Sequence, residues 1–400
     1  MIRDVVVVGG GPAGAATAIH LARAGLDVCV LDRARFPRDK ACGEFLSPAA
    51  TPLLEDLGVR DAIDAAGAKR LEQVRIFGGD QRLDLAFPAD ADAPPWGYAL
   101  SRRKLDAILL DAARSAGAEV QEGVQVDDLV LDRGRVAGVT TRGANGVRDS
   151  IRSRLVIGAG GRNCPVARVL GLQRRSSRRR IDLLAHWTTD VPAPEAECEL
   201  HVGRVGYVAA APVEGARLNI NCVVPQTTLQ RSPDPTLVYS DMLQRHPSLA
   251  RWIVGKRAEP IVATDITPLT TARATADGAL LVGDSALFLD PFTGQGIYLA
   301  LASAQLAAGV TARALSASSV DRATLADYDR LRAREFRAKQ RVSVAIQRII
   351  DRPWLTRRVI RALRRNRELA DTLAAVTGDL VPADHAWQLD FGYHIARAAI

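Results

Sequence analysis

The chain lacks long apolar runs, and this argues against helices that cross a membrane. No apolar stretch in its 400 residues approaches the ~18 that such a helix needs. Residues 4–8 lead directly into a glycine-rich turn, which is not the pattern of a secretory signal peptide. The sequence therefore predicts a cytoplasmic protein.

Cysteine is also scarce, and neither cysteine nor histidine has the spacing of a metal site. The five cysteines are scattered and odd in number, which favours reduced thiols over a disulfide framework. The six histidines show no metal-ligand spacing either, so we predict no bound metal. The residues concerned are Cys29, Cys42, Cys164, Cys198 and Cys222, and His20, His186, His201, His246, His385 and His394.

Acidic residues are too few to balance the basic ones. The 53 Lys and Arg face 45 Asp and Glu, so the formal net charge is +8. Two arginine-rich runs stand out, residues 174–180 and 352–367, and the second has apolar residues on one helical face. Such runs form solvated helix faces, contact an anionic membrane surface, or recruit an acidic partner such as a carrier protein. No recognised nucleic-acid-binding module accompanies the charge, so nucleic acid is not an expected partner.

What the chain does have is a glycine-rich turn near its start. The β-branched run Val5–Val8 predicts a buried strand, and Gly9, Gly11 and Gly14 then follow the pattern G-x-G-x-x-G before a helical run. The first glycine permits the tight turn, the second lets backbone amides approach a pyrophosphate, and the third lets helix and strand pack closely. Pro12 and Ala13 complete the turn, and the helix N-terminus faces the phosphates.

A second strand completes the unit. Residues 28–31 are apolar, and Asp32 follows about twenty residues after the turn, where a carboxylate can accept a hydrogen bond from a ribose hydroxyl. Arg33 comes next and opens a long polar loop, residues 33–48. We therefore predict an α/β fold that binds a dinucleotide, with Asp32 and Arg33 at the cofactor.

The rest of the chain predicts an inserted sheet. Alternating residues between 73 and 87 indicate a hairpin, and strands without helices dominate residues 175–265. Helices are expected at 298–315, 321–345 and 353–377. We expect dinucleotide-binding segments at 1–72, 101–174 and 269–320, a substrate-domain hairpin at 73–100, a mostly antiparallel β-sheet substrate domain at 175–268, and a C-terminal helical region at 321–400.

Together, three motifs resemble those of the flavin-dependent hydroxylase and geranylgeranyl-reductase superfamily, over residues 3 to about 315. The resemblance implies a Rossmann-like FAD-binding domain of the glutathione-reductase type. The first motif is the glycine-rich turn. The most specific is Gly283-Asp284 followed by Pro291-x-x-Gly294-x-Gly296-Ile297. It implies that Asp284 accepts from the ribityl hydroxyl of FAD. The family's cofactor contacts then fall on Gly294, Gln295, Gly296 and Ile297, at a helix N-terminus beneath the flavin, and on Arg102.

The remaining motif bears on the electron donor. The family has Ala-Asp-Gly after an apolar strand, in contact with both flavin and NAD(P)H, but here the sequence is Ala159-Gly160-Gly161. A glycine thus replaces the acid. The resemblance implies NADPH or NADH as the reductant, and a separate flavin reductase is the alternative.

The loop before residue 45 resembles that of the reductase group. In that group the pair Cys42-Gly43 lies beside the isoalloxazine, so both are candidate cofactor contacts. Cys42 is either a thiol that positions or protonates the substrate or a small buried filler. Halogenases have a related loop without the cysteine, and their W-x-W-x-I-P stretch is absent here, which disfavours halogenation.

The substrate sheet differs from the family's pattern. Gly206-Tyr207 begins the stretch that matches G-Y-x-W-x-F-P, but Ala209 and Ala211 replace the two aromatic residues. This loss of side-chain volume predicts a bulkier or differently shaped substrate than an isoprenoid chain. Tyr207 is the second candidate catalytic residue.

These features predict an FAD-dependent oxidoreductase. The first hypothesis is hydride transfer at flavin N5 to or from a carbon–carbon bond of a lipophilic, polyketide-like or isoprenoid-like substrate, free or attached to a carrier. The alternative is a monooxygenase that hydroxylates or epoxidises through a C4a-hydroperoxide. A flavin electron carrier without its own substrate is the third hypothesis, and the separate sheet domain argues against it.

Overall fold

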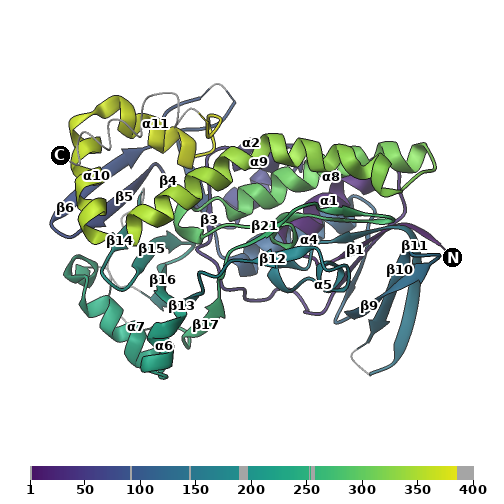
Figure 1. The fold of residues 1–400 in the computed structure, drawn as a ribbon, viewed down its shortest axis with the longest axis horizontal. Coiled ribbons are helices and arrows are strands. Elements are labelled where there is room, and N and C mark those ends of the chain that lie inside the picture. Colours follow the sequence, from purple (N-terminus) through teal and green to yellow (C-terminus); the bar gives the residue numbers. More distant parts are fainter. Residues whose placement is uncertain are drawn as a thin grey trace.

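The computed structural model describes residues 2–90, 92–143, 146–188, 197–251, 253 and 257–384. His385 and His394 lie outside these residues. Figure 1 shows two sheets side by side, with long helices running across both. Within the described ranges, no helix is long and apolar enough to cross a membrane.

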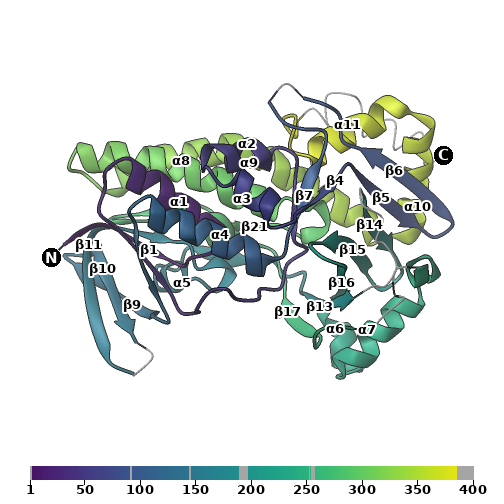
Figure 2. The same cartoon turned by 180° about the vertical axis from the view of Figure 1, so that it is seen from behind.

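The first sheet is the predicted parallel one. Its order is β19-β20-β11-β1-β2-β8, and β1 pairs in parallel with both β2 and β11. The four valines of β1 are almost completely buried, because helices and strands cover both faces of the sheet. Helix α1 lies between α4 and α8 on one face (Figure 2). The bounds are β1 Arg3–Val8, β2 Val28–Asp32, β8 Glu119–Glu122, β11 Arg148–Gly158, β19 Thr275–Ala276, β20 Ala279–Leu281, α1 Pro12–Arg23, α4 Arg102–Ser115 and α8 Gly296–Ser316.

The second sheet has the order β17-β13-β16-β15-β14-β5-β6. The predicted hairpin, β5 and β6, joins its edge, and β14 pairs with β5 in parallel while the other neighbours are antiparallel. The mostly antiparallel substrate sheet is therefore confirmed. The bounds are β17 Val262–Asp265, β13 Arg180–Thr188, β16 Arg217–Pro225, β15 Tyr207–Val213, β14 Glu197–Val202, β5 Gln73–Gly78 and β6 Gln81–Ala86.

Alternation along the strands gives this second sheet two different faces. On one face, buried apolar residues such as Leu183, Val208 and Ile220 pack against Tyr239 and Met242 of α7 (Pro235–Gln244). The opposite face looks toward the first sheet and the C-terminal helices, and α10 and α11 cover its β5–β6 edge (Figure 1). This second face is the one available to a ligand.

The described part of the C-terminal region, residues 321–384, contains three helices. Helix α9 (Arg322–Ile350) is followed by α10 (Pro353–Arg365) and α11 (Arg367–Thr377). The prediction that residues 353–377 are helical is confirmed except at Asn366, which separates two helices. Asn366 has an extended backbone, and its side chain accepts a hydrogen bond from the amide of Leu369, so it ends one helix and caps the next.

The other elements connect these layers. They are β3 Phe45–Leu46, β4 Lys69–Leu71, β7 Gly97–Ala99, β9 Gln125–Asp132, β10 Arg135–Arg142, β12 Gln173–Arg175, β18 Leu269–Thr271, β21 Leu287–Phe288, α2 Ala50–Asp56, α3 Arg60–Ala65, α5 Pro165–Val169 and α6 Gln226–Arg231, with short 3-10 turns at Gly161–Asn163, Pro247–Arg251, Gly283–Ser285 and Pro291–Thr293.

Candidate cofactor and substrate site

The first turn leaves no room for side chains. A Cβ atom at Gly14 would lie 1.8 Å from the carbonyl oxygen of Gly9, and a Cβ at Gly9 would lie 2.5 Å from that of Ala159. Gly9 also has a φ of 112°, a conformation that other residues rarely adopt. Helix α1 begins directly after Gly11, so its first amides face the same point as the predicted phosphates.

Asp32 is buried at the end of β2 and fixes this turn. Its Oδ2 accepts from the amide of Gly10 at 2.7 Å, and its Oδ1 accepts from the amide of Ala34 at 2.8 Å. The carboxylate thus organises the backbone around the turn. Its contact with a ribose hydroxyl stays a prediction, as does a contact between the cofactor and the exposed Arg33.

Two arginines lie over the same turn. The Nη2 atoms of Arg38 and Arg102 lie 3.6 and 3.7 Å from the position that a Cβ of Gly11 would occupy. Arg102 is held by hydrogen bonds of 2.7 and 2.8 Å to the buried Asp106, which also pairs with Arg38 at 3.1 Å. Desolvation lowers the pKa of Lys40, and Arg102 and Arg38 lower it further, so a third cation lies nearby. This excess of positive charge fits the diphosphate of FAD.

Asp284 lies in the same charged environment, after β20. Desolvation raises the pKa of its carboxyl, while Arg162, Arg102 and Lys40 oppose the rise. One acid and several cations therefore converge from segments far apart in the sequence. This arrangement suits a ligand with both hydroxyl donors and phosphate acceptors, as FAD has.

The third motif forms a tight turn that leads into α8. Gly294 has a φ of 69°, and a Cβ there would lie 2.6 Å from the ring of Phe45. Gln295 is buried, and its Nε2 donates to Asp379 at 2.6 Å. Helix α8 begins at Gly296, so the predicted helix N-terminus at Gly296 and Ile297 is confirmed. The flavin contacts of this turn stay predictions.

The Cys42–Glu44 segment lies between the two sheets. The amide of Glu44 donates to the sulfur of Cys42 at 3.3 Å, and Asn219 of β16 donates to the carbonyl oxygen of Cys42 at 2.8 Å. Desolvation raises the pKa of the Cys42 thiol, and nearby Arg102 opposes this. On balance the thiol is kept protonated.

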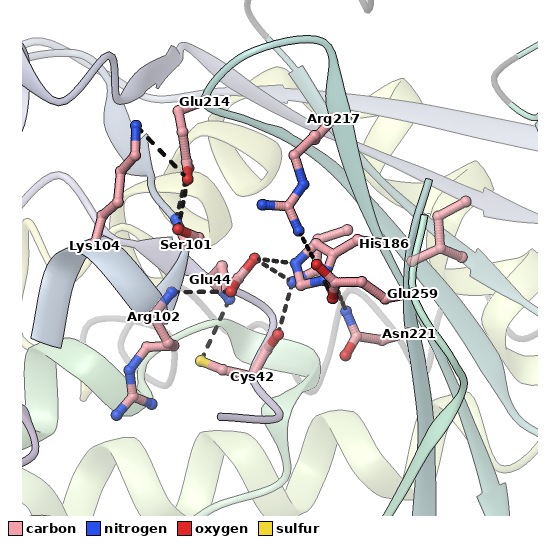
Figure 3. A network of polar contacts seen from close by, with 12 residues as sticks. Cys42, Glu44, Ser101, Arg102, Lys104, His186, Glu214, Arg217, Asn221 and Glu259 are labelled. Carbon is pink, nitrogen blue, oxygen red and sulfur yellow. Dashed lines mark hydrogen bonds and ion pairs between the residues drawn. The ribbon is translucent and has the colours of Figure 1, made fainter. Parts of the chain in front are cut away.

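Glu44 is the centre of a polar network that sequence reasoning did not find (Figure 3). Its Oε1 accepts from the amide of Arg102 at 2.9 Å. Its Oε2 accepts from Asn219 at 2.7 Å and lies 2.8 Å from Nε2 of His186. The other ring nitrogen of His186 lies 2.8 Å from Glu259. The glutamate is visible in the motif, but its side-chain partners are 58 to 175 residues away, so the sequence gives no signal for the pairing.

An apolar cavity extends from this segment across the second sheet. Its volume is about 1190 Å³, including the part open to solvent. Gly43, Pro291 and Gly294 border it on the side of the predicted flavin turns. Ala209 and Ala211 line its wall, as the sequence predicted for the substrate sheet. Farther along, it is bordered by Leu83 and Leu85 of β6 and by Val359, Ile360 and Leu363 of α10.

Tyr207 lies apart from the lining of this cavity, at the start of β15. Its hydroxyl donates to Oδ1 of Asp290 at 2.9 Å, and its ring packs edge-on against Phe292. It borders a second, polar cavity, which is lined by residues 178–180 and Asp351. The catalytic role predicted for Tyr207 stays a prediction, and its present contacts fix the turn around Asp290.

Comparison with known proteins identifies the family. A model of the FAD binding domain matches residues 3–342. The chain belongs to this FAD-binding family. The resemblance inferred from the motifs is thus confirmed, and FAD is the cofactor that the glycine turn and the arginines described above fit.

Members of this FAD-binding family with different activities resemble the chain. Digeranylgeranylglycerophospholipid reductase 1 of Methanopyrus kandleri is 32% identical over 340 residues, which cover 84% of this chain and 87% of that protein. Tryptophan 2-halogenase of Chondromyces crocatus is 29% identical over 337 residues, which cover 81% of this chain but only 63% of the halogenase. A geranylgeranyl bacteriochlorophyll reductase-like protein from Thermoplasma acidophilum superposes with a TM-score of 0.74 at 23% identity, covering 99% of this chain and 95% of that one, and so shares the fold.

Proposed function

We propose that this FAD-dependent oxidoreductase reduces or dehydrogenates a carbon–carbon bond of a lipophilic substrate. The observation that carries the proposal is the apolar cavity beside the Cys42–Glu44 segment. When bound, FAD would supply hydride transfer at N5. The cavity crosses the strands from β16 to β6, a distance of about 19 Å at the usual strand spacing, which suits an extended hydrocarbon chain.

The walls of the cavity support a bulky substrate. Ala209 and Ala211 stand where the reductase group has aromatic residues, and they leave space on the wall facing the C-terminal helices. Few polar side chains line the space, chiefly Glu199, Asn219 and Asn221. A mostly apolar lining with few polar groups binds a lipophilic molecule and orients it at one end.

We assign different tasks to the residues around the reacting end. The protonated thiol of Cys42 is the candidate proton donor to the substrate, because reduction of a double bond needs one proton beside each hydride. Gly43 and Gly294 have no side chains, so each lets the backbone come close to the reacting end of the cavity, one on each side. Tyr207 holds Asp290 and thereby the turn that precedes α8, which is a positioning role.

The electron donor is proposed to be NADPH or NADH. Gly160 stands at the position of the family's acid, and a Cβ there would lie only 3.2 Å from Cα of Cys164 and 3.3 Å from Cδ of Pro165. The backbone at this point has little space for a side chain, so a bound nicotinamide would have to be held by other groups. A separate flavin reductase is the alternative partner. The test is whether NADPH or NADH reduces the flavin of the purified holoenzyme when no other protein is present. Reduction supports the nicotinamide nucleotide as the direct donor, and its failure supports a separate flavin reductase.

We also propose that the protein contacts an anionic membrane surface through α10. The inner face of this helix borders the apolar cavity, and its outer face carries the exposed residues Trp354, Arg357, Arg361 and Arg365. A helix with an apolar face and an arginine face is typical of binding to anionic lipid. Such a contact would bring the cavity next to lipophilic substrates.

The test of the proposed reaction is a product mass. The FAD-loaded protein is reduced with NADPH or dithionite and incubated with long isoprenoid and polyketide-like alkenes. Hydride transfer from reduced flavin predicts products heavier by two hydrogens. In a parallel incubation of the oxidised holoenzyme with saturated analogues, hydride transfer to the flavin predicts products lighter by two hydrogens, and both products should form equally well without oxygen. Products that gain an oxygen atom, or a halogen atom when halide is present, would overturn the proposal. The halogenase relative makes the halide condition a necessary part of the test.

A further inference from the structure

His186 lies on β13, on the face of the second sheet that looks toward the Cys42–Glu44 segment. Only about 6% of the residue is exposed. Its Nε2 lies 2.8 Å from Oε2 of Glu44, and its Nδ1 lies 2.8 Å from Oε2 of Glu259 (Figure 3). One imidazole thus connects two carboxylates from segments more than 200 residues apart.

Two short contacts to carboxylates define the charge of the ring. A neutral imidazole has one donor nitrogen and one acceptor nitrogen, so it can donate to only one carboxylate. The imidazolium donates from both nitrogens. Both distances are hydrogen-bond distances, so the observed geometry is that of the protonated ring.

The inner end of this arrangement fixes the Cys42–Glu44 segment. The carboxylate of Glu44 is almost fully buried and also accepts from Asn219 and from the amide of Arg102. Glu44 has a φ of 58°, a left-handed conformation that its side-chain contacts must hold against its steric cost. His186 is the group that supplies positive charge to this buried carboxylate on the side of the sheet.

The other end of this arrangement, Glu259, reaches solvent. The side chain of Glu259 is 40% exposed and pairs with Arg217 of β16. Protons can therefore exchange between solvent and His186 through Glu259 without passing through the apolar cavity. The protonation state of the buried ring can follow the external pH.

We propose that His186 is a positioning residue of the flavin reaction: its imidazolium is a protonation-dependent clamp that holds the Cys42–Glu44 segment against the substrate sheet. The clamp is the set Glu44, His186 and Glu259. Loss of the ring proton removes one of its two hydrogen bonds and frees the segment that presents Cys42 and Gly43. The inference rests on the proposed function, because it assumes that this segment borders the reacting groups.

The direction of the pH effect follows from the groups that face His186. They are Glu44 from the segment before β3, Glu259 from the segment before β17, and Arg217 on β16 through its contact with Glu259. Burial lowers the pKa of His186, but the hydrogen bonds to the two glutamates outweigh it, so the pKa is raised from 6.5. The clamp is therefore closed at low pH and opens as pH rises through the raised pKa.

The experiment compares kcat against pH for the FAD-loaded wild type and three variants. The wild type should lose activity as pH rises through the raised pKa of His186, with KM for the lipophilic substrate little changed. His186→Gln should lose this inflection and lower kcat about tenfold or more at low pH, because misplacement near reacting groups is costly. Glu259→Gln keeps the size of the side chain and should lower the midpoint by about 1 pH unit.

His246→Gln is the matched control. Burial lowers the pKa of His246 to about 4, so this ring is neutral over the assay range, and the variant should keep the wild-type inflection. If Glu259→Gln leaves the midpoint unchanged, the clamp is overturned even when His186→Gln fails to fold. An unchanged profile in His186→Gln overturns it directly.

The proposed function is tested separately in the same samples. The visible spectrum of bound FAD and the mass of the product report on cofactor and reaction whatever the pH profile. If the wild type forms the expected product but its profile of kcat against pH lacks the inflection expected for wild type and His246→Gln, the clamp alone is contradicted. A wild type that neither adds two hydrogens to the substrate nor removes two from it contradicts the function.

Discussion

Gly14 packs against Gly9 more closely than any side chain allows. The contact joins the N-terminus of α1 to the end of β1, and a Cβ at residue 14 would lie 1.8 Å from the carbonyl oxygen of Gly9, a clash that no rotamer change relieves. Backbone would have to move. At the residue scale, the cofactor site therefore requires a residue without a Cβ atom at position 14, as much as it requires the charged groups around the turn.

Gly14→Ala should weaken FAD binding by about 3 kcal/mol, roughly a hundredfold in Kd, because the helix N-terminus shifts away from the phosphates. Gly309→Ala is the matched control. Gly309 is exposed on α8, and among the described residues only Arg313 lies near the position of its Cβ. The Gly309→Ala variant should therefore bind FAD with the affinity of the wild type. Titration of the apoprotein with FAD, followed by flavin fluorescence, gives both values. Equal affinities would contradict the tight packing of the turn.

Tyr207→Phe removes the hydrogen bond to Asp290 and leaves the ring in place. A positioning role predicts a loss of about 1–2 kcal/mol in unfolding free energy and a kcat within a few-fold of the wild type. Chemical unfolding and steady-state kinetics provide the two measurements. A fall in kcat of a hundredfold or more, with FAD content and stability retained, would show instead that the phenol takes part in the chemistry.

At the scale of elements, α10 has two different faces. Val359, Ile360 and Leu363 border the apolar cavity, whereas the arginines of the opposite face are exposed. Gly78 of β5 lies directly beneath the helix, since a Cβ there would lie 2.7 Å from Ile360. A membrane contact through the outer face would therefore act on an element that borders the substrate.

The triple variant Arg357→Gln, Arg361→Gln and Arg365→Gln should bind anionic vesicles about a hundredfold more weakly, at about 1 kcal/mol for each arginine. The control carries Arg334→Gln, Arg337→Gln and Arg341→Gln on α9, which are also exposed. Co-sedimentation with vesicles of phosphatidylserine and phosphatidylcholine measures the partition. The wild type should also lose binding at high salt. If the α9 and α10 variants behave alike, the surface of α10 is not the membrane contact.

Local patterns predicted most of these elements, and pairing over long distances was missed. The β1–α1–β2 unit was predictable because Gly9, Gly14 and Asp32 lie within about thirty residues and each has one structural reason. The parallel pairing of β14 with β5 was not, since it joins segments about 120 residues apart and nothing in either strand specifies the partner. The same holds for Glu44 and His186.

At the scale of the whole molecule, several buried acids make stability depend on pH. Asp182 on β13 is only 4% exposed, and burial raises its pKa from 3.8 to about 7, although Arg162 opposes the rise. The folded state thus binds a proton that the unfolded state has released between these two values. This group's contribution to stability is therefore present at low pH and is lost as pH rises from about 4 to about 7.

Asp182→Asn should remove this dependence. The difference in unfolding free energy between variant and wild type should move in favour of the variant as pH rises through this window and stay constant above it, because only the wild type has to ionise or desolvate the carboxyl. Urea unfolding of the holoenzyme at several pH values measures the difference. A difference that is flat from pH 4 to 8 would show that Asp182 is ionised in the folded state.

The two sheets together make the enzyme, because FAD is held by the first and the apolar cavity lies along the second. The most direct measurement is an anaerobic single turnover. FAD-loaded protein is reduced, freed of excess reductant, and mixed without oxygen with a long-chain alkene while the visible absorbance of the flavin is recorded. Hydride transfer to the alkene predicts that absorbance of oxidised FAD returns with formation of one reduced product per flavin. Flavin that stays reduced with every lipophilic alkene until oxygen is admitted, and product that then carries an oxygen or halogen atom, would contradict it.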